Sequence, residues 1–291
     1  MDQISKKIKM ISEKLKELKN KFNLNEIDGY VVPKNDEYFS EFAKKDKLKT
    51  ITGFDGSFGI AIILKKKNFL FVDGRYVEQA KIQAGKKFKI LEIPKKLPYQ
   101  VLNSSLNLGF DPMIFTSRSL QYYFRGKIKL TPISKTMINS KTLDGYKSRK
   151  FYSLNRKVVG ETVNSKIKRL IKILKKDGSD HIFISAPENV AWLLNIRGRD
   201  NPFSPIPYCR IILNTKGEVS FFSDIKNSSN IFKKKDFSRT SFFKDSQIEK
   251  FLNNLNVKKI IIDKNSCSVL LENLISSKFK VSNIGDPLYL M

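Results

Sequence analysis

The chain has 291 residues, of which 41% are hydrophobic and 11% aromatic, and its formal net charge is +27. This length and composition supply enough apolar side chains for one large domain or two ordinary ones, and they exclude a disordered or fibrous chain. The single histidine, His181, excludes a metal site built on several imidazoles of one chain.

The strong positive charge, taken alone, suggests nucleic acid or an anionic membrane surface as a partner. Only ten of the 55 basic residues are arginines, and the lysines are spread along the chain in short runs such as Lys65–Lys67. Proteins that read base sequence favour arginine, and a dedicated nucleic-acid arm concentrates its charge. We therefore interpret the charge as a compositional bias, and we expect no specific nucleic-acid partner.

The cysteines and the apolar runs indicate the compartment. Cys209 and Cys267 lie far apart and match neither a zinc nor a redox spacing. The N-terminal residues lack the apolar core of a signal peptide, and no apolar run approaches the roughly 18 residues of a membrane span. We expect a cytoplasmic protein without a membrane partner.

The first half of the chain alternates helices and strands. Apolar residues at helical spacing predict an amphipathic helix from Ile4 to Phe22, which leads into a short buried strand, 27–32, closed by Pro33. A second helix is expected over 36–45. Two strands, 59–64 and 68–72, follow as a hairpin, and Asp73 then turns the chain into a helix that runs to Ala84.

The second half repeats this plan. A helix around Ile167–Leu174 leads into a strand, 181–185, and Val31–Asn35 aligns with Ser185–Asn189. The hairpin that ends at Asp73 aligns with the one that ends at Asp224. The remaining expected elements are a helix over 248–255, a strand over 258–262, a helix over 267–275, and no capped element over 285–291.

This duplication predicts an α/β protein with two related domains, each a mixed β-sheet flanked by helices. We place the domains at residues 1–150 and 155–291. The joint is expected in the basic, turn-rich stretch 141–157, where the apolar periodicity lapses.

Two stretches of the first domain could carry chemistry. The glycines of Thr52–Gly59 suggest a phosphate-binding loop, but the lysine of a P-loop is missing, so a tight turn is favoured. Asp73–Tyr76 places Arg75 at the corner between a strand and a helix. Arg75 could bind a carboxylate or a peptide carbonyl through two hydrogen bonds, or it could form an internal ion pair with Asp73, and the pattern alone does not decide between them.

Two features of the second domain are interpreted as structural. Trp192–Asp200 contains the single tryptophan and predicts the end of an amphipathic helix, with Trp192 buried and with Asn195 and Arg197 capping the turn. His181, at the start of a strand, has no histidine partner for metal binding.

Four stretches together resemble one known family. Gly53–Ser57, Asp73–Tyr76, Gly109–Pro112 and Trp192–Asp200 follow one another as in the two N-terminal, creatinase-like domains of a three-domain Xaa-Pro aminopeptidase, also called aminopeptidase P, of the M24 metallopeptidases. Phe58 stands where the family usually has a small residue, and Arg199 stands where serine is common. These two departures concern loop geometry rather than family membership.

The resemblance implies what this chain does and lacks. In the family a third, pita-bread domain hydrolyses the N-terminal X-Pro bond with two metal ions, usually manganese, and that domain is absent from this sequence. No catalytic residue, metal ligand or cofactor is therefore expected here. The resemblance assigns Arg75 to substrate binding, and it implies that the two domains support a homodimer and help to wall the cleft for an X-Pro peptide.

Two alternatives stay open at this stage. The chain could be a standalone, noncatalytic module for peptide binding or dimerisation. It could also be a basic nucleic-acid-binding protein, whose affinity would fall steeply with salt.

Overall fold

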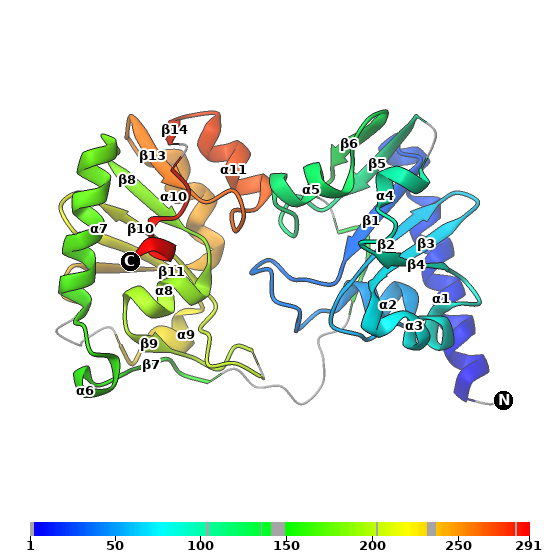
Figure 1. Ribbon diagram of the computed structural model, residues 1–291, viewed down its shortest axis with the longest axis horizontal. Coiled ribbons are helices and arrows are strands. Elements are labelled where there is room, and N and C mark those ends of the chain that lie inside the picture. Colours follow the sequence, from blue (N-terminus) through cyan, green and yellow to red (C-terminus); the bar gives the residue numbers. More distant parts are fainter. Residues whose placement is uncertain are drawn as a thin grey trace. The chain divides into compact units, whose positions relative to one another are not determined.

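The structure of the chain is a computed structural model that describes residues 3–102, 105–134, 136–140, 149–201, 203–231, 237–282 and 284–291. Its contacts divide the chain into two compact units, Met1–Asp144 and Gly145–Met291 (Figure 1). The two units together account for all 291 residues. Residues 141–148 of the predicted joint lie outside the described residues.

Unit 1 contains six paired strands and the helices that flank them. Its α-helices are α1 (Gln3–Asn20), α2 (Lys47–Thr52), α3 (Val77–Ala84), α4 (Pro98–Val101) and α5 (Ser117–Tyr123), and its 3-10 helices are η1 (Asn23–Asn25) and η2 (Gly74–Tyr76). Its strands are β1 (Gly29–Pro33), β2 (Gly59–Leu64), β3 (Asn68–Asp73), β4 (Lys89–Ile93), β5 (Leu106–Phe110) and β6 (Ile128–Pro132).

Unit 2 has a second sheet and a small strand pair. Its helices are α6 (Arg156–Val159), α7 (Val163–Asp177), α8 (Pro187–Leu193), α9 (Ile225–Ser228), η4 (Asp245–Gln247), α10 (Ile248–Asn254), α11 (Val269–Ser276) and η5 (Pro287–Leu290). Its sheet strands are β8 (His181–Ile184), β10 (Cys209–Asn214), β11 (Val219–Ser223), β12 (Thr240–Lys244), β13 (Lys259–Ile262) and β14 (Lys280–Ser282), and β7 (Tyr152–Ser153) pairs with β9 (Ile196–Arg197).

The two large sheets have the same topology. Within the described residues the strand orders are β4-β3-β2-β1-β5-β6 and β12-β11-β10-β8-β13-β14. The central strand, β1 or β8, pairs antiparallel with the hairpin after it, β2-β3 or β10-β11. The remaining strands, β4, β5 and β6 or β12, β13 and β14, add to these in parallel. The predicted duplication and the two mixed sheets flanked by helices are confirmed.

One aspartate fixes the start of the central strand in each unit. The backbone N–H of Asp28 donates to the carbonyl of Asn107, and its carboxylate accepts from the N–H of Asn107 at 2.8 Å. Asp180 makes the same pair of contacts with Lys259, at 2.9 and 3.0 Å. Counted from these anchors, Pro33 matches Ser185, so the alignment of Val31–Asn35 with Ser185–Asn189 was wrong by two residues. Two prolines had been aligned, but Pro33 lies within a strand and Pro187 begins a helix.

The core of unit 1 shows why α1 forms. Ile11, Leu15 and Leu18 recur on one face of the helix, Phe22 lies just beyond its end, and each is at most 6% exposed. They pack against the sheet residues Val32, Ala61 and Ile63 and against α2 and α3. Each fully buried side chain of this size contributes roughly 1.5–3 kcal/mol to the stability of the fold. This burial holds α1 on the sheet, and the lysines between the apolar residues lie on the outer face of the helix.

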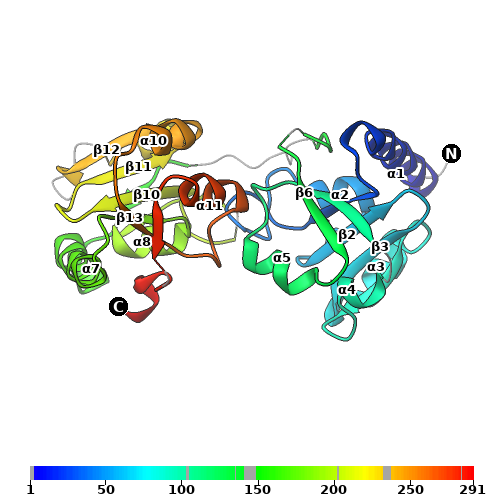
Figure 2. The ribbon, with the colours of Figure 1, turned by 90° about the horizontal axis from the view of Figure 1, so that it is seen from above.

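The sheet of unit 2 is covered on both faces (Figure 2). Its strands alternate: Ile182, Ile211 and Phe221 face α7 and α8, whereas Phe183, Ile212 and Phe222 face α10 and α11. Because successive side chains of a strand point to opposite faces, a sheet with two apolar faces needs nearly continuous apolar strands. The runs of isoleucine and phenylalanine in β8, β10 and β11 meet this need.

The chain end differs from the expectation. Leu288 lies in η5, and Asp286 caps this 3-10 helix by accepting from the backbone N–H of Leu288 at 2.9 Å. Asn189 of α8 donates to the same carboxylate at 2.6 Å. The absence of a capped element over 285–291 was therefore a wrong prediction, because Asp286 followed by Pro287 is a local capping pattern.

Candidate functional site

Arg75 lies at the corner between β3 and α3, as the sequence predicts. Asp73, the last residue of β3, accepts from the backbone N–H of Arg75 at 3.0 Å and from its side-chain Nε at 2.9 Å. The Arg75 side chain is 74% exposed. The internal ion pair is therefore present, and it uses only the inner nitrogen of the guanidinium. Among the described residues no hydrogen bond engages its two terminal nitrogens.

The charges at this corner reinforce one another. Hydrogen bonds from the side chain and backbone of Arg75 hold the pKa of Asp73 below its ordinary value, and the Asp73 hydrogen bond raises the pKa of Arg75. The negative charge of Glu41 acts on Arg75 in the same direction. The site therefore keeps a permanent, outward-facing cation, which is suited to a carboxylate or to a polarised carbonyl.

Tyr76 connects Arg75 to the glycine-rich loop, which is the stretch Thr52–Gly59. The guanidinium carbon of Arg75 lies 5.4 Å from the centroid of the Tyr76 ring. The Tyr76 hydroxyl is 2.8 Å from Oγ of Ser57, and its ring meets Phe54 edge to face at 6.0 Å. A side chain on Gly56 would lie 2.3 Å from the Phe54 ring, so this loop accepts only glycine at that position. The two motifs are separate in the sequence, and the fold joins them.

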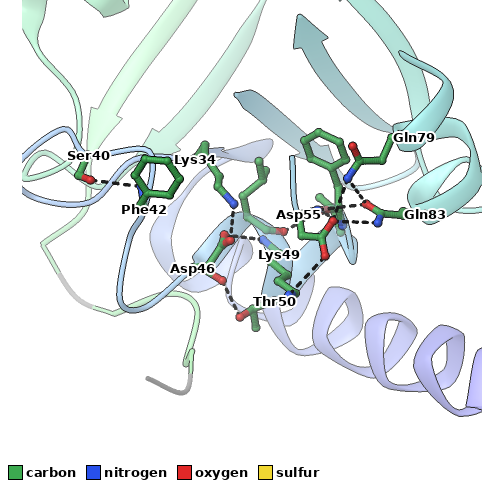
Figure 3. A network of polar contacts seen from close by, with 12 residues as sticks. Lys34, Ser40, Phe42, Asp46, Lys49, Thr50, Asp55, Gln79 and Gln83 are labelled. Carbon is green, nitrogen blue, oxygen red and sulfur yellow. Dashed lines mark hydrogen bonds and ion pairs between the residues drawn. The ribbon is translucent and has the colours of Figure 1, made fainter. Parts of the chain in front are cut away.

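The loop is a structural turn, as predicted. Gly53 has φ +78° and ends α2, which is a conformation that glycine adopts without strain. Asp55 then fixes the loop to α3, because it accepts hydrogen bonds from Gln79 at 2.9 Å and from Gln83 at 2.8 Å (Figure 3). The Lys49 ammonium of α2 forms an ion pair with the same Asp55 carboxylate at 3.4 Å.

The protonation of Asp55 follows from these contacts. Partial burial raises its pKa, but the hydrogen bond from Gln83 and the charge of Lys49 outweigh burial, so the net pKa lies below the ordinary value. The carboxylate therefore stays ionised and occupied, and it serves the loop rather than a ligand. This role of Asp55 was not predicted from the sequence, because the glutamines lie 24 and 28 residues away.

A buried ion pair fixes the start of α2, the helix that leads into the glycine-rich loop. Lys34 and Asp46 are 2.5 Å apart, with side chains only 10% and 7% exposed (Figure 3). Asp46 is also the N-cap of α2, where it accepts from the backbone N–H of Lys49 at 2.8 Å. The pair thereby links the end of β1 to the start of the helix that leads into the glycine-rich loop.

The helix expected over 36–45 does not form, and this prediction was wrong. The Asp36 carboxylate accepts from the backbone N–H groups of Tyr38 at 2.9 Å and Ser40 at 3.0 Å. Phe39 has φ +59°, outside the helical region. Side chains of this type compete with helical hydrogen bonds and favour turns. The segment between β1 and α2 is therefore a turn-rich loop, and it carries Glu41.

The tryptophan stretch of unit 2 is structural, as interpreted. Asn195 ends α8 in a left-handed conformation with φ +53°, and Arg197 donates to the carbonyl of Ala191 at 3.3 Å. The Lys166 ammonium donates to Asn195 at 2.7 Å and lies 4.1 Å from the centroid of the Trp192 ring. Trp192 itself is half-buried rather than fully buried.

The family departures, the cysteines and the described helices add no further candidate site. Phe58 and Arg199, the two departures from the family pattern, lie outside helices and strands. Cys209 and Cys267 are buried free thiols. In the part of the chain that the structure describes, no three His, Cys, Asp or Glu side chains gather where a metal ion could be held. No described helix is both long enough and apolar enough to cross a membrane.

Comparison with known families decides the relationship. A family model described as the creatinase/prolidase N-terminal domain matches residues 144–291, and a second model with the same description matches residues 14–139. The chain belongs to the creatinase/prolidase N-terminal domain family. It contains two such domains in tandem, and the resemblance to the N-terminal part of Xaa-Pro aminopeptidases is confirmed.

Relatives of these creatinase/prolidase N-terminal domains are aminopeptidases. A probable Xaa-Pro aminopeptidase P of Laccaria bicolor is 31% identical over 229 residues, which cover 73% of this chain and 36% of that relative. Xaa-Pro aminopeptidase 1 of Dictyostelium discoideum is 27% identical over 291 residues, covering 91% of this chain and 46% of that relative. The chain thus spans less than half the length of these relatives.

A solved structure shares the fold of the two creatinase/prolidase N-terminal domains. The X-prolyl aminopeptidase from Caenorhabditis elegans, described as a cytosolic enzyme with a di-nuclear active site, matches with a TM-score of 0.80 at 20% identity. The match covers 96% of this chain and 50% of that one. Both units of the present chain therefore have counterparts within one solved enzyme.

Proposed function

We propose that this chain is the noncatalytic N-terminal portion of an Xaa-Pro aminopeptidase and that Arg75 anchors the peptide substrate. The observation that carries the proposal is the geometry of Arg75. Its inner nitrogen is fixed by Asp73, its terminal nitrogens are left for a ligand, and the neighbouring Tyr76 ring is held by Ser57 of the glycine-rich loop. A guanidinium held in this way is preorganised for two parallel hydrogen bonds.

The group that Arg75 binds is a peptide carbonyl or carboxylate. Both offer oxygen lone pairs in the plane of the guanidinium fork. The contact orients the peptide and takes no part in breaking a bond, since Arg75 stays protonated throughout the accessible pH range. Arg75 is therefore a binding residue rather than a catalytic one.

Hydrolysis of the X-Pro bond belongs to a third domain that lies outside this sequence. The two manganese ions implied by the family resemblance find no set of ligands among the described residues, so no step of the reaction is assigned to this chain. The proposed substrate of the whole enzyme is a peptide with proline as its second residue. The names of the fungal and Dictyostelium relatives support this choice.

The proposal extends to assembly and location. We place the enzyme in the cytoplasm, with support from the cytosolic relative of Caenorhabditis elegans. We also propose that the two domains support a homodimer. Light scattering during gel filtration tests this point: a dimer has twice the chain mass of 33.6 kDa, and a monomer at all concentrations contradicts dimerisation through these domains alone.

A hydrolysis assay tests the noncatalytic assignment. The purified chain is incubated with the tripeptide Ala-Pro-Ala and Mn²⁺, and mass spectrometry is used to look for free alanine. We expect no product above a no-protein control. Turnover that scales with the concentration of the chain would overturn the proposal, because it would require a catalytic centre within these two domains.

A further inference from the structure

Unit 2 contains a hollow at one end of its sheet that the peptide site does not use. Its volume is about 650 Å³, within the range of small-molecule sites. It lies on the face covered by α10, near the start of β8 and the end of β10, and it is lined by His181, Ile212, Asn214, Lys216, Glu218, Val219, Ser220, Ser238, Arg239, Thr240, Ser241, Phe251 and Leu255.

The sequence of the strands explains the hollow. Under α10, Phe222 of β11 and Phe243 of β12 stack with their centroids 5.3 Å apart, and Phe251 of α10 packs on both at 5.2 Å. Two residues earlier on each strand, on the same face, are Ser220 and Ser241. These serines are direct neighbours in the register. Along this face of β11 and β12, a cross-strand pair of phenylalanines is thus followed by a cross-strand pair of serines.

The change coincides with the end of the helix that covers the sheet. α10 stops at Asn254, and Phe251 and Leu255 form one wall of the hollow. Beyond the end of α10 the sheet face is open, with Ser220 half-buried and Ser241 exposed, so that it presents hydroxyl groups to the hollow. These hydroxyl groups and the apolar wall of Phe251 and Leu255 therefore line the same accessible hollow.

The rim of the hollow is cationic. Lys216 and Arg239 both line it, and Nη1 of Arg239 is fixed by a 2.9 Å hydrogen bond to the carbonyl of Lys216. The one acidic side chain among the lining residues, Glu218, accepts from Asn214 at 2.7 Å. Two cations and a pair of hydroxyls therefore face the same space as an apolar wall.

We propose that this hollow binds a small organic phosphate that carries a planar ring. The phosphate oxygens accept from Arg239, Lys216 and the serine hydroxyls, and the ring lies against Phe251 and Leu255. Cationic and hydroxyl donors are the usual partners of phosphate, and aromatic side chains bind the face of a ring. This site is independent of Arg75 and of the proposed aminopeptidase function.

His181 provides a direct readout of binding. It is the single histidine of the chain and lines the hollow, so its imidazole C–H signals in the proton NMR spectrum are unique. Its Nδ1 is buried and has no hydrogen-bond partner within the described residues. A ligand that enters the hollow therefore shifts one pair of signals that needs no assignment.

The test titrates the full chain with adenosine monophosphate, inorganic phosphate and adenosine. Adenosine monophosphate is expected to shift the His181 signals saturably, at lower concentrations than either of its halves. Arg239→Gln should weaken this binding about tenfold or more, as expected for the loss of a charged hydrogen bond. Ser220→Val should also weaken binding, because it removes one of the hydroxyl groups that donate to the phosphate. Lys250→Gln, an exposed position on α10 outside the lining, is the matched control and should bind normally.

Three results would overturn the proposal. The first is no saturable shift at millimolar adenosine monophosphate. The second is inorganic phosphate binding as tightly as adenosine monophosphate, because the ring would then contribute nothing. The third is unchanged affinity in both Arg239→Gln and Ser220→Val, provided that thermal unfolding shows both variants to be folded.

Discussion

Arg75 and Lys226 occupy equivalent positions in the two halves of the chain. Each follows an aspartate at the end of the sheet hairpin, and each donates its backbone N–H to that aspartate, at 3.0 Å to Asp73 and 2.9 Å to Asp224. Arg75 adds a second bond from its side chain. The duplication kept the turn in both units. Of these two positions, only Arg75 in unit 1 carries a planar guanidinium, because unit 2 has Lys226 there.

The first prediction concerns the stability of this corner. Arg75→Ala and Lys226→Ala should both leave the midpoint of thermal unfolding unchanged, because both side chains are exposed and the aspartates still cap their turns through the backbone. Differential scanning calorimetry checks this. A marked loss of stability in Arg75→Ala alone would mean that Arg75 serves the fold.

The second prediction concerns the contact that joins the two motifs. Tyr76→Phe removes the hydroxyl bonded to Ser57 and should lower the free energy of unfolding by about 1 kcal/mol. Ser57→Ala should cost a similar amount, and the double variant little more, because both changes remove one bond. Tyr122→Phe, on an exposed tyrosine, is the control. Fully additive losses in urea denaturation would contradict the assigned bond.

The third prediction concerns the buried pair of Lys34 and Asp46. Lys34→Met should lower the free energy of unfolding by about 3–5 kcal/mol, because it leaves the Asp46 carboxylate buried without its cation. Adding Asp46→Asn should restore part of this loss, since asparagine is neutral and still caps α2.

A control for this pair comes from Lys95, whose side chain is 74% exposed beside Glu92. Lys95→Met should change stability by less than about 1 kcal/mol. Equal losses in Lys34→Met and Lys95→Met would show that burial does not determine the energy of the Lys34 pair.

How far the sequence predicts the fold depends on whether the determining contacts are local. The helix with Ile11, Leu15 and Leu18 on one face and the hairpin of β2 and β3 follow from spacing alone, and both are confirmed. No strand was predicted at Lys89–Ile93, which has no buried residue and gains its place by pairing with β3. Strand order depends on such distant pairings, so one sequence does not reveal it.

The same distinction applies to the site. The pair of Asp73 and Arg75 spans two residues and was one of the two predicted alternatives. The contact of Ser57 with Tyr76 spans 19 residues, and the hydrogen bonds to Asp55 span up to 28. These contacts join motifs that are separate in the sequence, and only the folded chain reveals them.

The fourth prediction concerns His181. Burial lowers its pKa below the ordinary value of 6.5, and the opposing charges of Asp180 and Glu218 do not compensate fully. The unfolded chain therefore binds more protons than the folded chain between the two pKa values. The stability due to neutral His181 is complete above pH 6.5 and is lost as the pH falls through the lower, folded pKa.

NMR titration of the single imidazole checks the shift, and urea denaturation across this pH range checks the sign. His181→Gln should flatten the fall in stability on the acid side. A folded-state midpoint above 6.5 would contradict the prediction.

The fifth prediction concerns the two thiols. Burial raises the pKa of both Cys209 and Cys267, so neither forms a reactive thiolate at neutral pH in the folded chain. Iodoacetamide should modify neither cysteine in the native protein and both in urea, as read by intact mass. Rapid labelling of either one under native conditions would place it at the surface.

The central claim is that Arg75 anchors a peptide, and a paired titration tests it most directly. Ala-Pro-Ala is titrated by isothermal calorimetry into the wild-type chain, Arg75→Ala and the matched control Lys226→Ala. We predict that Arg75→Ala weakens binding about tenfold or more, as the loss of a charged hydrogen bond does, and that Lys226→Ala binds like the wild type. Equal affinities in all three proteins, or no binding to the wild type, would contradict the claim.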